Sequence, residues 1–125
     1  MDNKEFAEIR HRLGKSQREM GQLLAVSVKA IQSFEQGWRN IPAHVERHIL
    51  FLLAMKKSGT EGTPCWVIQN CPTDLKEKCP AWEFKSGHLC WFINGTICQG
   101  EVQRNWQSKM DTCRRCKVFN SAFAL

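Results

Sequence analysis

Seven cysteines are the residues of this 125-residue chain with the clearest capacity for chemistry. Residues 1–64 contain none of them, whereas residues 65–116 contain all seven. Cysteine thiolates bind zinc and iron-sulfur clusters, and they also carry out thiol redox reactions. The positions are Cys65, Cys71, Cys79, Cys90, Cys98, Cys113 and Cys116. Because the count is odd and thiols stay reduced in the cytoplasm, we expect a metal or redox site rather than disulfides.

The spacing of the cysteines favours a cluster over a single zinc ion. Cys113 and Cys116 are the one pair with a two-residue gap, whereas zinc ribbons usually have two such pairs. Proline directly follows Cys71 and Cys79, as it follows ligands of some bacterial iron-sulfur clusters. A four-iron cluster is also wider than a zinc ion, so it tolerates scattered ligands better.

We therefore predict an iron-sulfur cluster of the 4Fe-4S type, with zinc as the alternative cofactor. The expected ligands are Cys71, Cys79, Cys98, Cys113 and Cys116. Cys65 and Cys90 are each followed by Trp, and they are either further ligands or buried thiols. Thiol redox chemistry at Cys113 and Cys116 is another alternative, because the two arginines between them would lower a thiol pKa. The strand-helix-strand pattern of thioredoxin-like proteins does not surround this pair.

The chain divides into two parts of different character, which together predict a mainly α fold. Residues 1–57 carry apolar residues at helical spacing and predict a bundle of four to five helices. Residues 58–64 are small, polar and turn-forming, which predicts a linker. Residues 65–125 predict a small, irregular cysteine-rich domain in which only residues 102–110 are expected to be helical. Such short segments form a poor core, so we expect a metal to staple this domain.

Caps and apolar periods predict the helices of the first part. Ser16 with Glu19 three residues later is a capping box, and Ser27 is a second N-cap. Gly14 and Gly37 are expected to end helices. The expected core residues are Phe6, Ile9, Leu13, Met20, Leu23, Leu24, Ala30, Ile31, Phe34, Val45, His48 or Ile49, and Leu52 or Leu53. The fourth helix is more apolar than a small bundle needs, and its surplus surface could serve dimerisation.

Residues 16–37 can be laid out as two helices joined by a tight turn. Gly21 would let these helices cross closely, and Ser27 would start the second helix so that its first turns project outward. Together with flanking residues, from about 5–55, the stretch resembles the lambda-repressor-like (XRE-type) helix-turn-helix family. The motif residues are Ser16, Gln17, Gly21, Ser27, Ile31, Glu35, Gly37 and Pro42. Two departures are Ala25, where the family usually has Gly, and Gly21, where it has Ala.

This resemblance implies that the chain binds double-stranded DNA. The implied contacts are Gln17 with phosphate, Val28, Lys29, Gln32 and Ser33 with base edges, and Arg39 and Asn40 with the DNA backbone. Arg10 and Glu35 occupy positions where the family often has an ion pair between helices. Trp38 is expected to pack rather than to contact DNA. The alternative is that these polar residues form only a solvated face, or that the bundle binds another protein.

The second part is similar to the cysteine-rich two-CW domain over about residues 65–120. The matching residues are Cys65-Trp66, Cys71, Cys79-Pro80-Ala81, Cys90-Trp91, Gly95-Thr96, Cys98, Cys113, Cys116 and Val118-Phe119. The similarity implies a shared seven-cysteine architecture and does not choose a metal. The spacer between Cys79 and Cys90 is shorter than is typical of that family.

The charge and the missing motifs narrow the function classes. The net charge of +6 makes nucleic acid a candidate partner. Residues 1–60 hold ten Lys and Arg against six Asp and Glu, and the rest hold eight against six. Paired carboxylates, a phosphate loop and a Ser-His constellation are missing, so we do not expect an enzyme. The apolar run at residues 49–55 is too short to cross a bilayer and no signal peptide is evident, so we expect a cytoplasmic protein without membrane association.

These patterns predict a DNA-binding transcription regulator with a redox-sensing cysteine-rich domain. The expected homodimer would form through the fourth helix or the cysteine-rich domain. Two alternatives stay open, a DNA-binding regulator with structural zinc and a thiol redox protein.

Overall fold

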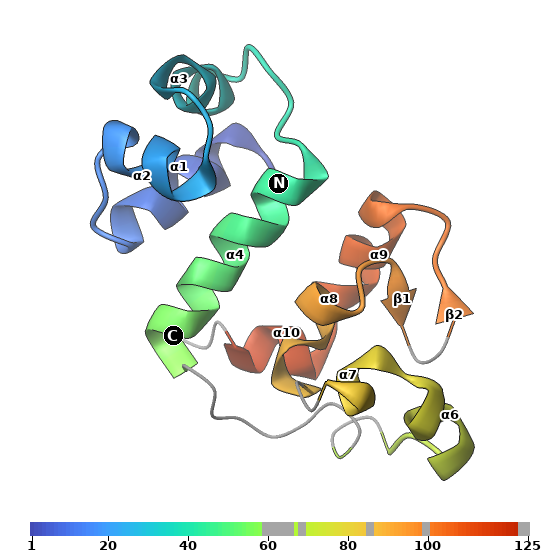
Figure 1. Cartoon of the computed structure of the whole chain (residues 1–125). Helices are drawn as coiled ribbons and strands as arrows, with labels where there is room; N and C mark the ends of the chain where they lie inside the picture. The colour runs from blue at the N-terminus through green and yellow to red at the C-terminus, as the bar shows by residue number, and fades with distance from the viewer. Residues whose placement is uncertain (59–66, 68–69, 85–86, 99–100, 123–125) are drawn as a thin grey trace. The chain divides into compact units, whose positions relative to one another are not determined.

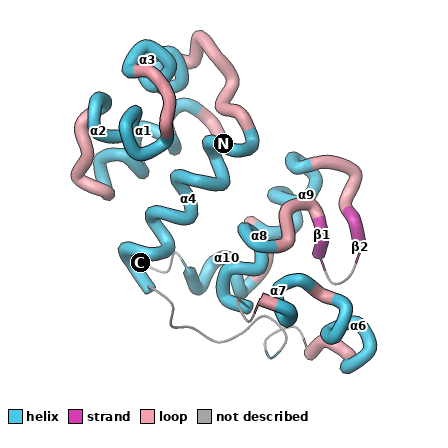
Figure 2. The backbone as a smooth tube through the Cα atoms, in the orientation of Figure 1, coloured by secondary structure: helices cyan, strands magenta, loops and turns pink. Residues whose placement is uncertain are grey.

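The computed structural model describes residues 1–58, 67, 70–84, 87–98 and 101–122, and most of this backbone is helical (Figure 1, Figure 2). The predicted mainly α fold is therefore confirmed. The chain forms two compact units, residues 1–56 and residues 57–125. Within the described ranges, no helix is long and apolar enough to cross a membrane.

The first unit is built from helices that follow the predicted order. They are α1 (Asn3–Arg12), α2 (Gln17–Leu24), α3 (Val28–Gln36) and α4 (Ala43–Ser58), and α4 is the long green helix of Figure 1. α4 ends at the first residue of the predicted linker. The rest of that linker, residues 59–64, lies outside the described residues.

Side-chain caps fix the starts of α2 and α3, as the sequence predicts. The Ser16 hydroxyl accepts a hydrogen bond from the Glu19 amide at 3.1 Å, and the Glu19 carboxylate accepts one from the Ser16 amide at 3.0 Å. These bonds hold the pKa of Glu19 below its usual value. Ser27 accepts from the Ala30 amide at 3.0 Å. Both caps satisfy amides that have no partner within a helix.

The core of the first unit draws apolar residues from each of its helices. They are Phe6, Ile9, Leu13, Met20, Leu24, Ala30, Ile31, Phe34, Val45, Ile49, Leu50, Leu53 and Ala54. The rings of Phe6 and Phe34 meet edge to face, with their centroids 5.7 Å apart. The prediction for Leu23 is wrong, because its side chain is 43% exposed. α2 packs through the face that carries Met20, Gly21 and Leu24, and Leu23 lies beside that face.

The turn between α2 and α3 is tight, as the helix-turn-helix layout predicts. The Val26 amide donates to the Gly21 carbonyl at 2.9 Å. Ala25 takes a left-handed conformation with φ of 58°, which favours glycine. A Cβ placed on Gly21 would lie 2.9 Å from the Val26 carbonyl oxygen and 3.7 Å from Ile31 Cγ1. The turn therefore comes too close to α2 at Gly21 for the alanine that is usual in the resembled family, whereas the contact with Ile31 on α3 would be an ordinary one.

The second unit consists of short helices and one hairpin. Its elements are α6 (Thr73–Lys78), α7 (Pro80–Glu83), a 3-10 turn η1 (Gly87–Leu89), α8 (Cys90–Ile93), β1 (Ile97–Cys98), β2 (Glu101–Val102), α9 (Trp106–Cys113) and α10 (Lys117–Ala122). β1 and β2 are antiparallel, with Ile97 opposite Val102 and Cys98 opposite Glu101. Figure 2 shows these strands in magenta among helical segments.

The single helix predicted over residues 102–110 is partly wrong. Val102 belongs to β2, and α9 begins only at Trp106 because Asn105 caps it, accepting from the Ser108 amide at 2.8 Å. The other helices of this unit were not predicted at all. With four to six residues each, α6, α7, α8 and α10 are too short to show a helical period in the sequence.

The second unit has an apolar core of its own within the described residues. Its buried apolar residues are Ala81, Leu89, Trp91, Met110, Cys113, Val118 and Phe119. The ring of Trp91 packs edge to face against Phe119, with centroids 5.6 Å apart. These contacts join α8 to α10 and leave the cysteines around a shared cavity.

Candidate functional site

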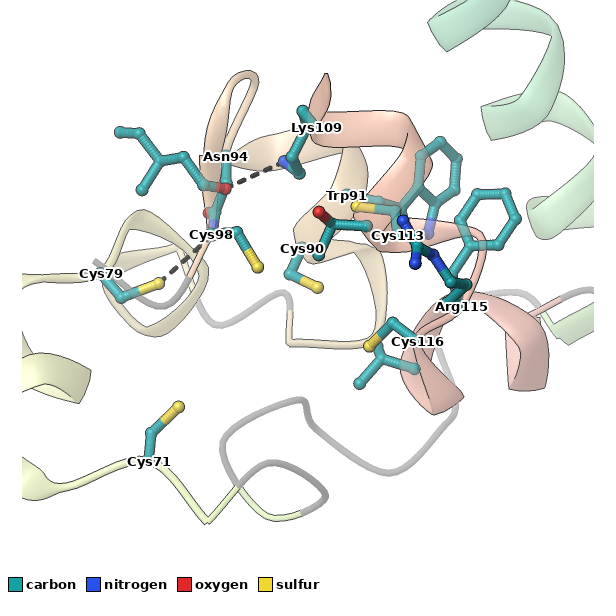
Figure 3. A pocket seen from close by; sticks show the side chains of 14 residues that line it. Cys71, Cys79, Cys90, Trp91, Asn94, Cys98, Lys109, Cys113, Arg115 and Cys116 are labelled. Carbon is teal, nitrogen blue, oxygen red and sulfur yellow. Dashed lines mark hydrogen bonds between the residues drawn. The ribbon is translucent and has the colours of Figure 1, made fainter. Parts of the chain in front are cut away.

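A cavity of about 450 Å³ brings together the cysteines of the second unit (Figure 3). Every cysteine in the described part of the chain lines it, namely Cys71, Cys79, Cys90, Cys98, Cys113 and Cys116. The five cysteines predicted as the main ligands thus share one site with Cys90, which the sequence left open. Cys65, the other open position, lies outside the described residues.

The cysteines lie at the ends of elements, which is how segments far apart in sequence reach one cavity. Cys79 is the N-cap of α7 and Cys90 begins α8. Cys98 ends β1, and Cys113 ends α9. The Cys116 amide donates to the Cys113 carbonyl at 2.9 Å, so a single turn connects this last pair.

Cys113 is the most deeply buried of these thiols. Cys113 is 4% exposed, and this burial raises the pKa of its thiol to about 11. The positive charge of Lys109 lowers the pKa of Cys113, whereas Cys98 and Cys116 raise it further. The arginines between Cys113 and Cys116 therefore do not produce the lowered thiol pKa that the sequence suggested for Cys113. A thiol that is neutral at pH 7 is a poor nucleophile, but a bound metal would deprotonate it.

Cys79 accepts a hydrogen bond from a buried amide. Asn94 Nδ2 donates to Cys79 Sγ at 3.3 Å, and Asn94 is 7% exposed. The Asn94 Oδ1 atom is buried without a partner among the described residues. Hydrogen bonds to ligand sulfurs orient thiolates and tune metal centres. Asn94 is thus suited to hold Cys79 as a ligand, a role that its place in the sequence did not reveal.

The cavity is lined by thiols, the donors that a thiolate-bound metal cofactor needs. Among the described residues, no three His, Cys, Asp or Glu side chains are grouped closely enough to hold a single metal ion. A zinc ion needs four donors, each about 2.0–2.3 Å from one point. The sulfur atoms surround a cavity of about 450 Å³, and Figure 3 shows the labelled cysteines around it. The chemistry of this donor set suits an iron-sulfur cluster and also zinc, and either would need local movement of the cysteines.

The first unit presents the residues predicted to contact DNA on α3 and the segment that follows it. Lys29, Gln32, Arg39 and Asn40 are exposed. Val28 and Ser33 are half-buried. Gly37 ends α3 in a left-handed conformation, and the amides of the next two residues both donate to the Ser33 carbonyl. The chain therefore holds Trp38 and Arg39 close to the end of the helix.

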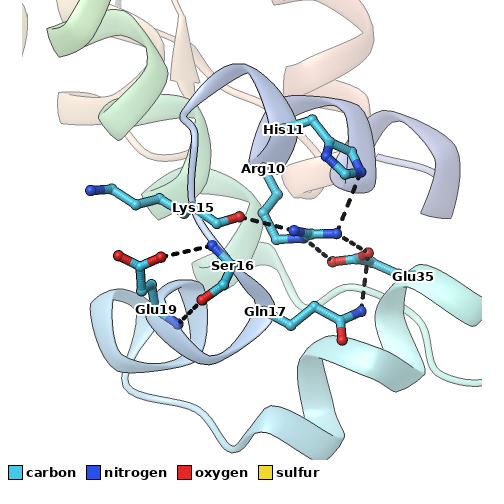
Figure 4. A network of polar contacts seen from close by, with 7 residues as sticks. All are labelled: Arg10, His11, Lys15, Ser16, Gln17, Glu19 and Glu35. Carbon is cyan, nitrogen blue, oxygen red and sulfur yellow. Dashed lines mark hydrogen bonds and ion pairs between the residues drawn. The ribbon is translucent and has the colours of Figure 1, made fainter.

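The predicted ion pair between Arg10 and Glu35 is confirmed, and it joins α1 to α3 (Figure 4). Arg10 donates from Nε to Glu35 Oε2 at 2.6 Å and from Nη2 to Glu35 Oε1 at 3.0 Å. The Gln17 amide also donates to Glu35 Oε1, at 3.3 Å. Gln17, which the family resemblance places at phosphate, is thereby held at the start of α2.

Trp38 is the residue of this face that sequence reasoning misjudged. Its side chain was expected to pack, but it is 80% exposed. Its amide donates to the Ser33 carbonyl at 3.0 Å, which fixes the backbone of Trp38 just after α3. A single tryptophan outside a helical period gives no sequence pattern that predicts whether its side chain is packed or exposed.

No protein-family model, curated protein or solved structure matches this chain.

Proposed function

We propose that this chain is a DNA-binding transcription regulator whose second unit senses redox state through an iron-sulfur cluster. The observation that carries the proposal is the convergence of six cysteines on one cavity. This set exceeds the four thiolates that a 4Fe-4S cluster needs. Metal binding there would add folding free energy to the small apolar core of this unit.

DNA binding is supported by the helix-turn-helix geometry of the first unit. Capped helices α2 and α3 meet at a tight turn, and Lys29 and Gln32 are exposed on α3. Lysine can donate to guanine O6 and N7, and glutamine can pair with adenine. The excess of positive charge in residues 1–60 favours binding to phosphate. In this proposal α3 is the recognition helix.

Sensing would proceed by a population shift in a homodimer. The recognition helices of a dimer must reach half-sites about 34–36 Å apart. Loss or oxidation of the cluster would remove the contacts that hold the cysteine-bearing element ends together, and the second unit would loosen. A changed second unit would alter how two copies pair, and DNA affinity would change with it.

The first experiment is a metal and sulfide analysis of the full chain purified without oxygen, together with its absorption spectrum. We expect brown protein with broad visible absorbance and with iron and inorganic sulfide in equal amounts. Stoichiometric zinc in colourless protein would contradict the cluster. Absence of both metals would contradict any metal-based account of the cavity.

Structural zinc is the second candidate, and the spacing of Cys113 and Cys116 favours it. This pair has the gap and the connecting turn that zinc sites commonly use. With structural zinc, the chain would still bind DNA but would not sense redox state. In the third alternative, thiol redox chemistry, the raised pKa of Cys113 disfavours this residue as the attacking thiol, because attack needs a ready thiolate.

A further inference from the structure

A lysine is buried in the wall of the cysteine cavity. Lys109 lies on α9 and is 1% exposed. Its Nζ atom donates to the Gly95 carbonyl at 2.6 Å and to the Ile97 carbonyl at 2.9 Å. Full burial of a lysine is rare, because removing an ammonium group from water costs several kcal/mol unless charge and hydrogen bonds compensate.

The two carbonyls tie the segment before Cys98 to α9. Gly95 takes a left-handed conformation with φ of 59°, and Ile97 begins β1, which ends at Cys98. Cys113 lies one helical turn after Lys109 on α9. The lysine therefore joins the elements that carry Cys98 and Cys113, and all three residues line the cavity drawn in Figure 3.

The charges around the cavity are of one sign. Among the described residues that line it, Lys109 and Arg115 are basic and none is Asp or Glu. Carbonyl oxygens satisfy N–H groups of Lys109 but carry no net charge. Four cysteinates around an iron-sulfur cluster give an anionic centre, and an added electron makes that centre more negative. A cationic wall thus complements the cofactor and favours its reduced form.

We propose that Lys109 is the counter-charge of the cysteine cavity, a positioning residue that helps retain an anionic metal-thiolate centre and raises its reduction potential. This inference rests on the proposed function, because it needs a metal centre in the cavity. The redox step is the entry of one electron from a soluble mediator into the cluster, with no bond formed or broken. The positive charge of Lys109 then offsets part of the negative charge that the cluster gains.

Three variants of the full chain separate charge from anchoring. Lys109→Gln removes the charge and keeps an N–H donor toward the carbonyls. Lys109→Arg keeps the charge and changes the shape of the donor. Arg104→Met is the matched control, because Arg104 is exposed in the same unit and does not line the cavity. Each protein is purified without oxygen and tested for helical content, iron and sulfide content, and midpoint potential.

We expect Lys109→Gln to shift the one-electron equilibrium at least tenfold toward the oxidised form, about 59 mV more negative. Loss of cluster from this variant at unchanged helical content would also support the inference, provided that Arg104→Met keeps wild-type content. Lys109→Arg should stay closer to the wild-type potential than Lys109→Gln does. Wild-type potential and iron content in Lys109→Gln would overturn the role of Lys109 while leaving the proposed cluster in place.

Metal analysis of the wild-type chain tests the proposed function independently of Lys109. If it carries zinc in place of iron and sulfide, redox sensing fails, and Lys109 is tested by zinc competition with a chelator. At least tenfold weaker zinc binding in Lys109→Gln would then support the counter-charge, and equal affinity would overturn it. A wild-type chain that binds neither metal would overturn both claims.

Discussion

Glu35 on α3 receives two hydrogen bonds from the guanidinium of Arg10 on α1, at 2.6 Å and 3.0 Å. Both side chains are largely buried, with exposures of 11% for Arg10 and 9% for Glu35. The same carboxylate accepts from Gln17 on α2. One acidic side chain therefore fixes α3 against two neighbouring helices, and this defines how α3 is presented to DNA in the proposed function.

Replacing Glu35 with Gln should destabilise the first unit by about 2 kcal/mol, because Arg10 would lose charged hydrogen bonds at a buried position. Urea unfolding followed by circular dichroism measures this change. Arg12→Met is the control, since Arg12 pairs with Glu8 at the surface at 2.9 Å. Loss of such an exposed pair should cost no more than about 0.5 kcal/mol. Equal losses for the two variants would show that burial does not strengthen the Arg10 pair.

Replacing Gly21 with Ala should lower stability, although alanine is the usual residue of the resembled family. The added Cβ would lie 2.9 Å from a backbone carbonyl, and backbone yields less readily than a side chain. Better helix propensity offsets part of the cost, so we expect a net loss of about 1 kcal/mol. A rise in the melting temperature would contradict the close approach of the Val26 carbonyl to Gly21.

Replacing Ala25 with Gly should have the opposite effect. Ala25 has a φ of 58°, where a Cβ costs roughly 1 kcal/mol and glycine is unstrained. The greater freedom of glycine in the unfolded chain reduces the benefit. We expect a small gain in the free energy of unfolding, and a measurable loss would argue against the left-handed turn.

Arg39 and Lys29 should contribute to DNA binding in different ways. If Arg39 contacts phosphate, Arg39→Ala weakens binding to all DNA sequences. It also reduces the slope of log K against log salt concentration by about 1. Lys29→Ala should instead cost about 1–3 kcal/mol on the preferred site and relax base preference there. Fluorescence anisotropy at several salt concentrations measures both effects. Lys4→Ala is the control, because Lys4 is exposed on α1 and carries the same charge. An unchanged slope and affinity in Arg39→Ala would remove this residue from the interface.

The metal-free second unit should lose stability in alkaline solution. Burial raises the pKa of Cys113 to about 11 from an unfolded value of 9.0, so the folded unit holds this proton more tightly. The associated stability is complete below pH 9.0 and is lost as the pH rises through about 11. The loss should be on the order of 2 kcal/mol. Chelator-treated protein is compared with Cys113→Ser, which has no thiol to ionise. The same alkaline loss in the serine variant would assign the effect to other groups.

The sequence predicted the first unit well because its signals are local. Ser16, Glu19 and Ser27 cap helices within four residues of themselves, and α1, α3 and α4 are long enough to show an apolar period. Leu23 and Trp38 were misjudged because their exposure depends on how the helix or loop is packed. Neither apolar character nor spacing contains that information.

The second unit was less predictable because its order depends on contacts between distant segments. Cysteine type and number pointed to a shared site, and all the described cysteines do line one cavity. Asn94 and Lys109 gave no comparable signal, since an isolated amide or lysine normally lies at the surface. Their positions depend on how the hairpin packs against α9. Helices of four residues and strands of two residues are too short to give a sequence pattern that predicts this packing.

The most direct test of the account compares DNA affinity in two forms of one preparation. The full chain is purified without oxygen, and half of it is stripped of its cofactor with a chelator and oxidant and then returned to reducing conditions. Fluorescence anisotropy on the preferred DNA site is measured for both halves at the same salt concentration. The account predicts affinities that differ at least tenfold, about 1.4 kcal/mol. Equal affinities in cofactor-loaded and cofactor-free protein would contradict redox sensing by the second unit.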